Sequence, residues 1–473
     1  MMEIPPADIR WGPSIRLWDL NGRVFFWDNR VFRAIYPHRL DFVRRLFDEG
    51  IIDELVSLDL LVPSWLTEYE LEGFGAVVEH ERQDVDSKPW EWPHLILMEA
   101  ARVYLQLLRI LDRHGLTLHD GHAHNFSLAP GGRVRWHDFG SLVEQEATKF
   151  PGLSEFMESL MWPLELADLH ADLSILRRLQ MRVTTEDFLR LRGRRHNRLL
   201  LKSRARILRP AQIVQARLAH SDARGLRTLS VLIHEIAVRM TRRSRPRADA
   251  SRLDQIEKLV DRFKPIEKTT LWSSYYGVGG LKERSAEASP REKEVVQVLR
   301  EFKPQRVLDI GANEGLFSRL AAEIADVVIA TDTDEEATHK HVLNVRSAPS
   351  RIRVYPLFHN ILTLTDAEAE RMRSDVVLAL ALTHHLRLGA GFPFDYIAQL
   401  FARLTRGLLV TEFMPNGLGG VERVVPDPLP DDYNLESFMG ALSGEFNHVD
   451  SLDIPTPPNR STRILVICRR PTI

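Results

Sequence analysis

The second half of the chain folds around one stretch, Arg306-Val307-Leu308-Asp309-Ile310-Gly311-Ala312-Asn313-Glu314-Gly315-Leu316-Phe317. It begins as a short apolar run, turns at glycines and continues as an amphipathic pattern to Ala322. A buried strand, a glycine-rich turn and a helix in this order open a nucleotide-binding α/β domain. Glycine lets the backbone pass close beneath a ligand, where a Cβ atom would collide. Asp309 ends the strand, at the edge of the sheet where such domains bind ligands.

Length and composition indicate a globular protein of more than one domain. The chain has 473 residues, 44% of them hydrophobic and 27% charged. Its net charge of −2 argues against nucleic acid as a partner. Cys468 is the only cysteine, which excludes an intrachain disulfide and a cysteine-rich metal cluster. The sequence has neither a signal-peptide pattern nor a transmembrane run, so we expect a cytoplasmic protein.

The first hundred residues predict a small sheet followed by a helix. The dipeptide Asn21-Gly22 is typical of a tight turn between two strands. Alternating and helical spacings predict strands at 14–18, 23–27, 31–35 and 75–80, and helices within 39–57 and at about 96–111.

Residues 118–140 carry the second informative pattern. Asp120 is followed by Asn125 after five residues and by Asp138 after a further 13, and His122 stands beside the first acid. The stretch resembles the catalytic core of the protein-kinase and aminoglycoside-phosphotransferase superfamily. The resemblance implies that Asp120 orients an attacking hydroxyl and that His122 takes a position where phosphotransferases have His or Lys. Asn125 and Asp138 would hold Mg²⁺ if ATP binds.

Two features of that superfamily are missing. Residues 1–90 contain no glycine-rich phosphate loop, and Lys88 is the first lysine, so no lysine can stand on the third strand. Arg33 could replace it, although a forked guanidinium is a different donor. We therefore predict a kinase-like α+β domain over residues 1–248 that has lost phosphotransfer, a pseudokinase. Nucleotide binding without transfer and active phosphotransfer remain open alternatives.

The chain is strongly basic between residues 190 and 247. A solvated helix face is the usual explanation, and a docking surface for an anionic acceptor is the alternative. Aromatic residues are nearly absent there, which counts against single-stranded RNA. The run 241–249 is the best candidate for a linker, so we expect a second domain over residues 249–473. The aromatic-rich segment 271–277 could form a lid or could simply pack.

After the opening stretch, further elements follow in the order of an α/β sheet. Asp332 ends the second strand about 20 residues after the turn, where a carboxylate can accept both ribose hydroxyls, and Asp334 is the alternative acid. The strands are expected at 306–310, 326–332, 351–357, 375–382 and 407–413, with a last antiparallel hairpin from 446–450 and 463–469.

This order of elements resembles class I methyltransferases that depend on S-adenosylmethionine (SAM). The segments 382–386 and 411–415 are similar to those of a nodulation-type bacterial group, whose members also carry an upstream segment like residues 120–140. The resemblance implies a Rossmann-like domain with a seven-stranded, mostly parallel sheet, and a small-molecule or glycan acceptor. It also implies that SAM is bound by Asp309, Gly311, Ala312, Asn313, Gly315, Asp332, Thr333, Asn360, Ala379 and Leu380.

Methylation of a hydroxyl group needs a base near the reacting methyl group. His384 or His385 could serve, because both follow the fourth strand, and Glu412 is another candidate. We expect one of the two histidines to be structural. The leading hypothesis is O-methylation of a saccharide, glycolipid or small-molecule hydroxyl. The alternatives are a bifunctional kinase–methyltransferase, a SAM-binding sensor and an NAD oxidoreductase.

Overall fold

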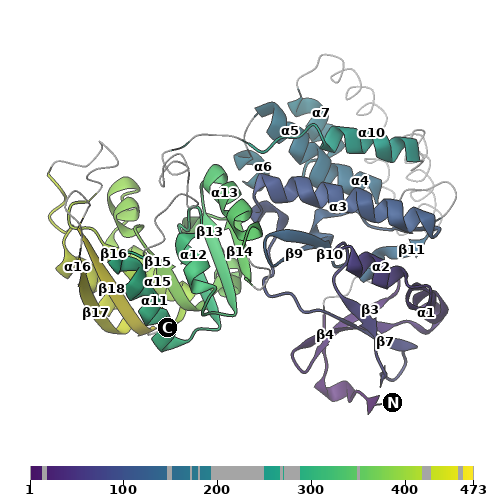
Figure 1. Ribbon diagram of the computed structural model, residues 1–473, viewed down its shortest axis with the longest axis horizontal. Coiled ribbons are helices and arrows are strands. Elements are labelled where there is room, and N and C mark those ends of the chain that lie inside the picture. Colours follow the sequence, from purple (N-terminus) through teal and green to yellow (C-terminus); the bar gives the residue numbers. More distant parts are fainter. Residues whose placement is uncertain are drawn as a thin grey trace, which may run out of the picture. The chain divides into compact units, whose positions relative to one another are not determined.

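The structure is a computed structural model (Figure 1), and it describes residues 2–12, 19–145, 152–170, 173–178, 180, 182–192, 250–266, 270, 288–348, 352–417, 428–455 and 462–471. The chain divides into two compact units. Unit 1 comprises Met1–Arg82, Leu97–Phe126 and Arg135–Lys264, and unit 2 comprises Gln83–Ile96, Ser127–Val134 and Pro265–Ile473. The expected boundary at 248–249, the linker, the segment 271–277 and nearly all of the basic region lie outside the described residues.

Unit 1 contains a five-stranded antiparallel sheet in the order β2-β3-β4-β7-β5. The tight turn lies at Asp28-Asn29, where both residues have positive φ, and not at Asn21-Gly22. Gly22 is instead the first residue of β3. Glycine is needed there because a Cβ atom would overlap the backbone of Ala34. The expected strand 14–18 lies outside the described residues. The sheet strands are β2 (Arg10–Trp11), β3 (Gly22–Trp27), β4 (Arg30–Ile35), β5 (Ser64–Leu66) and β7 (Ala76–His80).

Helices and short strand pairs complete unit 1. The helical pattern over 39–57 forms two helices, which are separated at Gly50 with a φ of 70°. Arg109 of α3 joins α10 to this unit, since its guanidinium lies 2.6 Å from Asp254 and 2.5 Å from Glu257. The helices are α1 (Leu40–Asp48), α2 (Ile51–Ser57), α3 (His94–Arg113, whose first turn belongs to unit 2), α4 (Leu153–Phe156), α5 (Trp162–His170), α6 (Ser174–Arg178), α7 (Thr185–Leu191) and α10 (Ala250–Val260). The short strands of unit 1 are β1 (Met2–Glu3), β6 (Tyr69–Glu70), β8 (Leu116–Leu118) and β11 (Leu142–Glu144). The pair β9 (Phe126–Ala129) and β10 (Arg133–Trp136) lies partly in unit 2, which includes Ser127–Val134.

Unit 2 is built on a seven-stranded mixed sheet in the order β14-β13-β12-β15-β16-β18-β17. The first five strands are parallel, and β18 runs antiparallel to both of its neighbours. The chain order therefore reverses direction between β12 and β15, which is where open α/β sheets bind ligands. The strands are β12 (Arg306–Ile310), β13 (Val327–Asp332), β14 (Val354–Phe358), β15 (Ser374–Ala379), β16 (Thr405–Phe413), β17 (Phe446–Ile454) and β18 (Arg463–Pro471).

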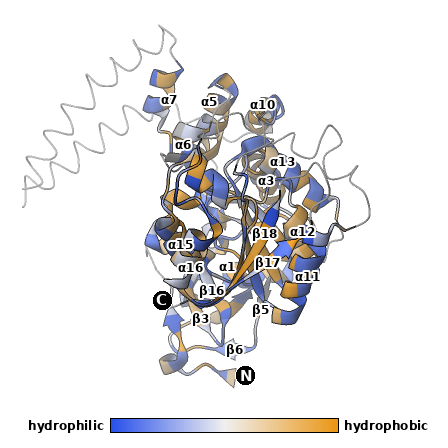
Figure 2. Ribbon diagram, turned by 90° about the vertical axis from the view of Figure 1, so that its left-hand side faces the viewer, coloured by the Kyte–Doolittle hydropathy of each residue, from blue (hydrophilic) through white to orange (hydrophobic). Residues whose placement is uncertain are grey.

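Alternate residues of these strands bury the two faces of the sheet. On one face, Val307 and Val328 belong to a core cluster that includes Val295 of α11 and Leu316 of α12. Helix α15 contacts β15 and β16 and also packs against α14 and α16. In Figure 2, α11 and α12 carry both hydrophobic and hydrophilic residues, as expected of helices that cover a sheet. The helices are α11 (Pro290–Phe302), α12 (Leu316–Ala321), α13 (Glu335–Arg346), α14 (Asp366–Met372), α15 (Phe394–Leu404) and α16 (Leu435–Ser443).

Residues 83–96, here called the strap, belong to unit 2 although they stand early in the sequence. The strap contacts the edge strand β14, because the Asp84 carboxylate accepts hydrogen bonds from Arg353 at 2.7 Å and from the Tyr355 hydroxyl. Further along, Glu91 accepts from the guanidinium of Arg371. The strap thus covers an edge that parallel sheets otherwise leave open. In the described residues, no helix is long and apolar enough to span a membrane.

Gly315 illustrates how tightly the turn of unit 2 is packed. Its φ is 90°, and a Cβ at this position would overlap the buried ring of His341 on α13. We expect Gly315→Ala to lower the free energy of unfolding by about 2–4 kcal/mol, because strain and overpacking add. Gly440→Ala is the matched control, since its Cβ would meet nothing within 4 Å. Urea unfolding of both variants measures the difference, and equal stability would contradict this packing.

Candidate active site

A cavity of about 360 Å³ lies at the carboxyl ends of β12, β13, β14 and β15. This volume is within the range of small-molecule sites. The cavity brings together nine of the residues singled out from the sequence, namely Asp309, Gly311, Ala312, Asn313, Asp332, Thr333, Asn360, Leu380 and His385. Sequence reasoning missed the other lining residues, which are Arg291, Ile310, Phe317, Thr331, His359, Ile361, Leu362, Ala381, Leu382, Leu386 and Ala390.

The turn after β12 forms the floor of the cavity. Gly311 and Asn313 have φ values of 69° and 52°, so the backbone curls beneath the space in a conformation that suits glycine and asparagine. Gly315 does not line the cavity and instead precedes α12. Asp309 is buried and accepts a hydrogen bond from the Ser318 hydroxyl at 2.6 Å. Burial raises the pKa of Asp309 to about 6, against the opposing effect of that hydrogen bond.

Asp332, at the end of β13, is the acid that faces the cavity. Its two carboxylate oxygens accept backbone N–H groups of Asn313 at 2.8 Å and Asp334 at 2.9 Å, which fixes the orientation of the carboxylate. Burial raises the pKa of Asp332 to about 6, although these hydrogen bonds oppose the shift. Asp334, the alternative acid, is used elsewhere, because its side chain caps α13 through the N–H of Ala337. Of these two acids, Asp332 is the one that lines the cavity.

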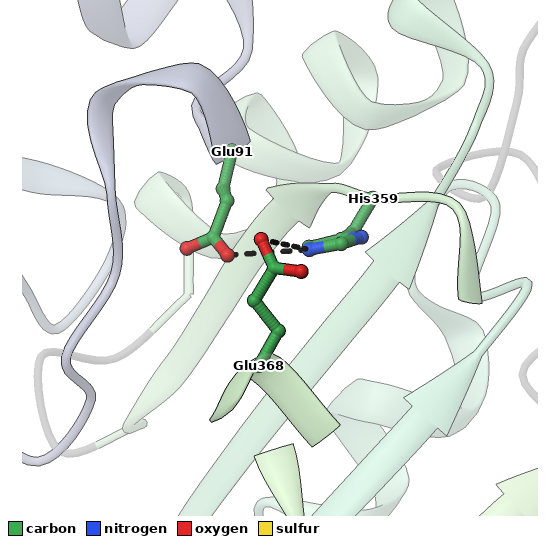
Figure 3. A group of neighbouring side chains, drawn as sticks. All are labelled: Glu91, His359 and Glu368. Atoms are coloured by element: carbon green, nitrogen blue, oxygen red, sulfur yellow. Dashed lines mark ion pairs between the residues drawn. The ribbon is translucent and has the colours of Figure 1, made fainter. Parts of the chain in front are cut away.

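The end of β14 contributes His359 and Asn360. The side-chain Oδ1 atom of Asn360 accepts a hydrogen bond from the backbone N–H of Leu362 at 3.0 Å and so caps a short 3-10 helix. The ring of His359 lies between the cavity and two carboxylates. Its Nε2 atom is 3.2 Å from Glu91 of the strap and 3.9 Å from Glu368 of α14 (Figure 3). Burial tends to raise the pKa of Glu91, but the neighbouring His359 ring and the Arg371 guanidinium bring it below its ordinary value.

Glu412 does not line the cavity and is not placed to act as a base. Its buried carboxylate is bound by Arg291 at 2.5 and 2.7 Å and by Arg463 at 3.1 Å. It also accepts the backbone N–H of Ala381 at 2.8 Å. Burial would raise the pKa of Glu412, but the charge of Arg291 and the hydrogen bonds lower it below its ordinary value. Ala381 has a φ of 55°, so Glu412 holds the strained turn that follows β15.

The two histidines after β15 have different surroundings. His385 lines the cavity, whereas His384 is buried behind it, and their ring centroids are 3.9 Å apart. Burial, together with the charges of His385 and Arg463, lowers the pKa of His384 to about 3. His384 is therefore neutral at ordinary pH and, unlike His385, does not line the cavity. Ala379, the last residue of β15, does not line the cavity.

The four residues that the sequence predicts for a kinase-like site lie in unit 1. Asp120 accepts the backbone N–H of His122 at 2.9 Å, and the amide nitrogen of Asn125 is buried without a hydrogen-bond partner. The guanidinium of Arg33, a buried residue on β4, lies 3.5 Å from Asp138 and 2.9 Å from Asp19. Burial raises the pKa of Asp138 to about 6 despite the positive charge of Arg33. A side-chain cation therefore stands next to the acid that was expected to hold Mg²⁺.

The cavity in unit 2 fits a nucleoside that carries a positive charge. Asp309 and Asp332 line the cavity as two carboxylates with raised pKa values, and a cationic ligand would favour their ionised forms. The backbone at Gly311 leaves room for a close ligand, and the walls from Leu362 and Leu382 are apolar. SAM combines these properties: ribose hydroxyls, an ammonium group, a sulfonium and a flat base.

The chain resembles a known protein over most of its length. The chain is similar to the nodulation protein NoeA of Rhizobium meliloti (strain 1021), with 25% identity over 469 residues that cover 92% of each chain. No protein-family profile matches the chain.

Solved structures give shorter and weaker matches. The N-methyltransferase NodS from Bradyrhizobium japonicum WM9, in complex with S-adenosylhomocysteine (SAH), is 13% identical, with a TM-score of 0.32 over 42% of this chain and 96% of that one. The O-methyltransferase from Bacillus cereus in complex with SAH is 14% identical, with a TM-score of 0.32 over 45% of this chain and 96% of the other.

Proposed function

We propose that unit 2 is a SAM-dependent methyltransferase and that its cavity binds SAM. The observation that carries the proposal is the position of Asp332 and the Gly311 turn at the reversal point of a sheet with the order β14-β13-β12-β15-β16-β18-β17. Asp332 would accept the ribose hydroxyls, and Asp309 would accept the ammonium group of the cofactor. When bound, SAM supplies a methyl group that is already activated by its sulfonium, so the protein needs mainly to align the acceptor.

The proposed reaction is O-methylation of a saccharide, glycolipid or other small-molecule hydroxyl. His385 supports this choice, because it lines the cavity next to the Ala381 turn and an imidazole can take a hydroxyl proton near neutral pH. A cytoplasmic location forms part of the proposal. Docking of an anionic acceptor on residues 190–247 stays a prediction, since nearly all of that region lies outside the described residues.

Two measurements test the proposed function. Titration calorimetry of the full-length chain should give binding of SAH, and the purified protein should transfer labelled methyl groups from SAM to a component of a host-cell extract. Tight binding of NAD with no binding of SAH would overturn the proposal. Binding of SAH without any transfer would favour a sensor that uses the same cavity.

The histidine pair gives a prediction about catalysis. We expect His385→Ala to slow single-turnover methylation by about 100-fold or more, because general bases contribute at least that much. His384→Gln should have a much smaller effect on the rate at saturating acceptor, since His384 does not reach the cavity. Equal losses in both variants would argue against His385 as the base.

For unit 1 we propose a kinase-like domain that no longer transfers phosphate and serves acceptor or partner recognition. The proposal is supported by Arg33, whose guanidinium stands beside Asp138 where a divalent cation would be needed. The competing proposal is a bifunctional kinase–methyltransferase, which the sequence spacing of Asp120, Asn125 and Asp138 favours.

Nucleotide binding separates these two proposals. We expect ATP with Mg²⁺ to leave the melting temperature of the full-length chain unchanged, because Arg33 already balances the charge of Asp138. Differential scanning fluorimetry makes the measurement. An increase of several degrees that is lost in Asp138→Ala would instead support a nucleotide-binding domain.

A further inference from the structure

His359 lies between the proposed cofactor cavity and the strap. The ring lines the cavity, and its side chain is 9% exposed. Its Nε2 atom is buried, makes no hydrogen bond of good geometry, and lies 3.2 Å from the carboxylate of Glu91 and 3.9 Å from that of Glu368. Figure 3 shows the other ring nitrogen, Nδ1, on the side of the ring away from both carboxylates. Nε2 therefore faces the carboxylates, and Nδ1 is the ring nitrogen left to interact with a ligand in the cavity.

The order of the strands indicates which part of the cofactor reaches His359. From β15 the sheet edge passes to β12, then to β13 and finally to the outer strand β14. With the ribose at Asp332 on β13, the methionine part extends towards β12 and β15, where Asp309 and His385 lie. The base must then lie towards β14. His359 and Asn360 are the polar side chains that β14 presents there.

An adenine edge needs one donor and one acceptor from the protein. Its 6-amino group donates a hydrogen bond, and the adjacent ring nitrogen N1 accepts one. The side-chain oxygen of Asn360 already accepts the N–H of Leu362, which orients its amide N–H₂ as the group free to donate. His359 is the neighbouring side chain that can supply an acceptor for the 6-amino group. His359 can supply it only if Nδ1 carries no proton.

The strap places a carboxylate beside the other nitrogen of His359, 3.2 Å from Nε2. A carboxylate beside Nε2 favours the tautomer with the proton on Nε2, which leaves a lone pair on Nδ1. The charge of Glu91 is already balanced by the guanidinium of Arg371, so Glu91 does not require a second cation at His359. Glu91 is fully buried, and the backbone N–H of Lys88 and the Arg371 guanidinium hold its carboxylate in place.

A metal ion is a poorer explanation of the same group. Glu91, His359 and Glu368 place one ligand atom each within 4.8 Å of one another. Both oxygens of Glu91, however, are bound by Arg371. One Glu368 oxygen accepts hydrogen bonds from Thr365 at 2.8 and 2.9 Å. A divalent cation would have to displace the guanidinium and lie beside its charge.

We propose that Glu91 of the strap is a positioning residue that fixes the tautomer of His359, so that Nδ1 accepts a hydrogen bond from the 6-amino group of the cofactor's adenine. Asn360 donates to adenine N1 beside it. The pair reads adenine and rejects hypoxanthine, whose 6-oxo group and N1–H reverse both hydrogen bonds. This inference rests on the proposed function and adds a residue from the strap to the cofactor site.

The test compares two ligands on the full-length chain by titration calorimetry: SAH and S-inosylhomocysteine, which differs at position 6 and at N1. We expect the wild type to bind SAH at least about 100-fold more tightly, since a mismatched ligand leaves buried polar groups unpaired. Glu91→Gln should reduce this ratio at least about tenfold. The glutamine amide can donate to Nε2 and so favour the tautomer with the proton on Nδ1, which accepts the wrong base.

Two further variants protect the test against misfolding. His359→Phe keeps a ring of similar size and leaves Glu91 paired with Arg371. It should lower the ratio of the two affinities about as much as Glu91→Gln does. Glu370→Gln removes the same charge from an exposed position on α14 and should leave the ratio unchanged. A ¹⁵N NMR spectrum of the His359 ring gives the tautomer directly, with the proton on Nε2 in wild type.

The outcomes separate this inference from the function beneath it. A chain that binds neither ligand overturns the proposed function. A wild type that binds SAH but discriminates no better than His359→Phe overturns the inference alone. A proton found on Nδ1, or a ratio that Zn²⁺ or EDTA changes in wild type, also overturns it, the latter in favour of a metal at the same three side chains.

Discussion

Glu412→Ala is expected to lower the free energy of unfolding of the protein by about 3–5 kcal/mol. The wild-type carboxylate is fully buried and neutralises Arg291 and Arg463, so its removal leaves two largely buried guanidinium groups facing each other. The N–H of Ala381 also loses its acceptor, at a residue with positive φ. The turn that borders the cavity should then loosen, so binding of SAH should weaken as well.

Chemical unfolding of the full-length chain measures the loss, and Glu436→Ala is the matched control. Glu436 is an exposed carboxylate in the first turn of α16, and its removal should cost less than about 1 kcal/mol. If the two variants were equally stable, the ion pairs of Glu412 would contribute nothing to the fold.

The ion pairs of Glu412 also predict how the stability of the protein depends on pH. The pKa of Glu412 is lowered in the folded state from its ordinary value of 4.5. Its contribution to stability is therefore fully present above pH 4.5 and is lost as the pH falls through the folded-state pKa. The stability difference between wild type and Glu412→Gln should be largest near neutral pH and should shrink in acid. A difference that grows on acidification would contradict the ion pairs.

The sheet of unit 2 could be predicted because its signals are local. Each strand is a short apolar run, and the Gly311 turn and the acid Asp332 stand at fixed distances from it along the chain. The seven-stranded sheet is confirmed, with five parallel strands and an antiparallel last hairpin. In unit 1 the turn at Asp28-Asn29 was missed, because Asn21-Gly22 is the stronger dipeptide signal but Gly22 is required for close packing against Ala34.

The functional side chains could be predicted only in part. Sequence reasoning placed His384, His385 and Glu412 together as candidate bases, but side-chain direction at the end of a strand decides which of them reaches the cavity, and only His385 does. Glu412 looked available because its partners Arg291 and Arg463 come from distant segments. The strap was missed for the same reason, since nothing near Glu91 in the sequence indicates contact with His359.

The largest effect on binding is expected from Asp332→Ala. The carboxylate is oriented by the N–H groups of Asn313 and Asp334, and it faces the cavity where the ribose hydroxyls would lie. Two hydrogen bonds to a charged acceptor contribute about 1.5–3 kcal/mol each. Their loss should therefore weaken binding of SAH by at least about 100-fold in titration calorimetry.

Asp334→Ala separates this role from a structural one. It removes the cap of α13 and should cost about 1 kcal/mol of stability, with little change in the affinity for SAH. Asp332→Ala should instead weaken binding of SAH strongly, and it leaves the N–H groups of Asn313 and Asp334 without their acceptor. Because burial raises the pKa of Asp332 from 3.8 to about 6, its ionisation costs stability as the pH rises between those values, so the stability of the wild type should fall relative to that of the variant over this range. If Asp334→Ala abolished binding while Asp332→Ala did not, the ribose would have to lie against the other acid, and the cavity could not hold the cofactor in the direction proposed.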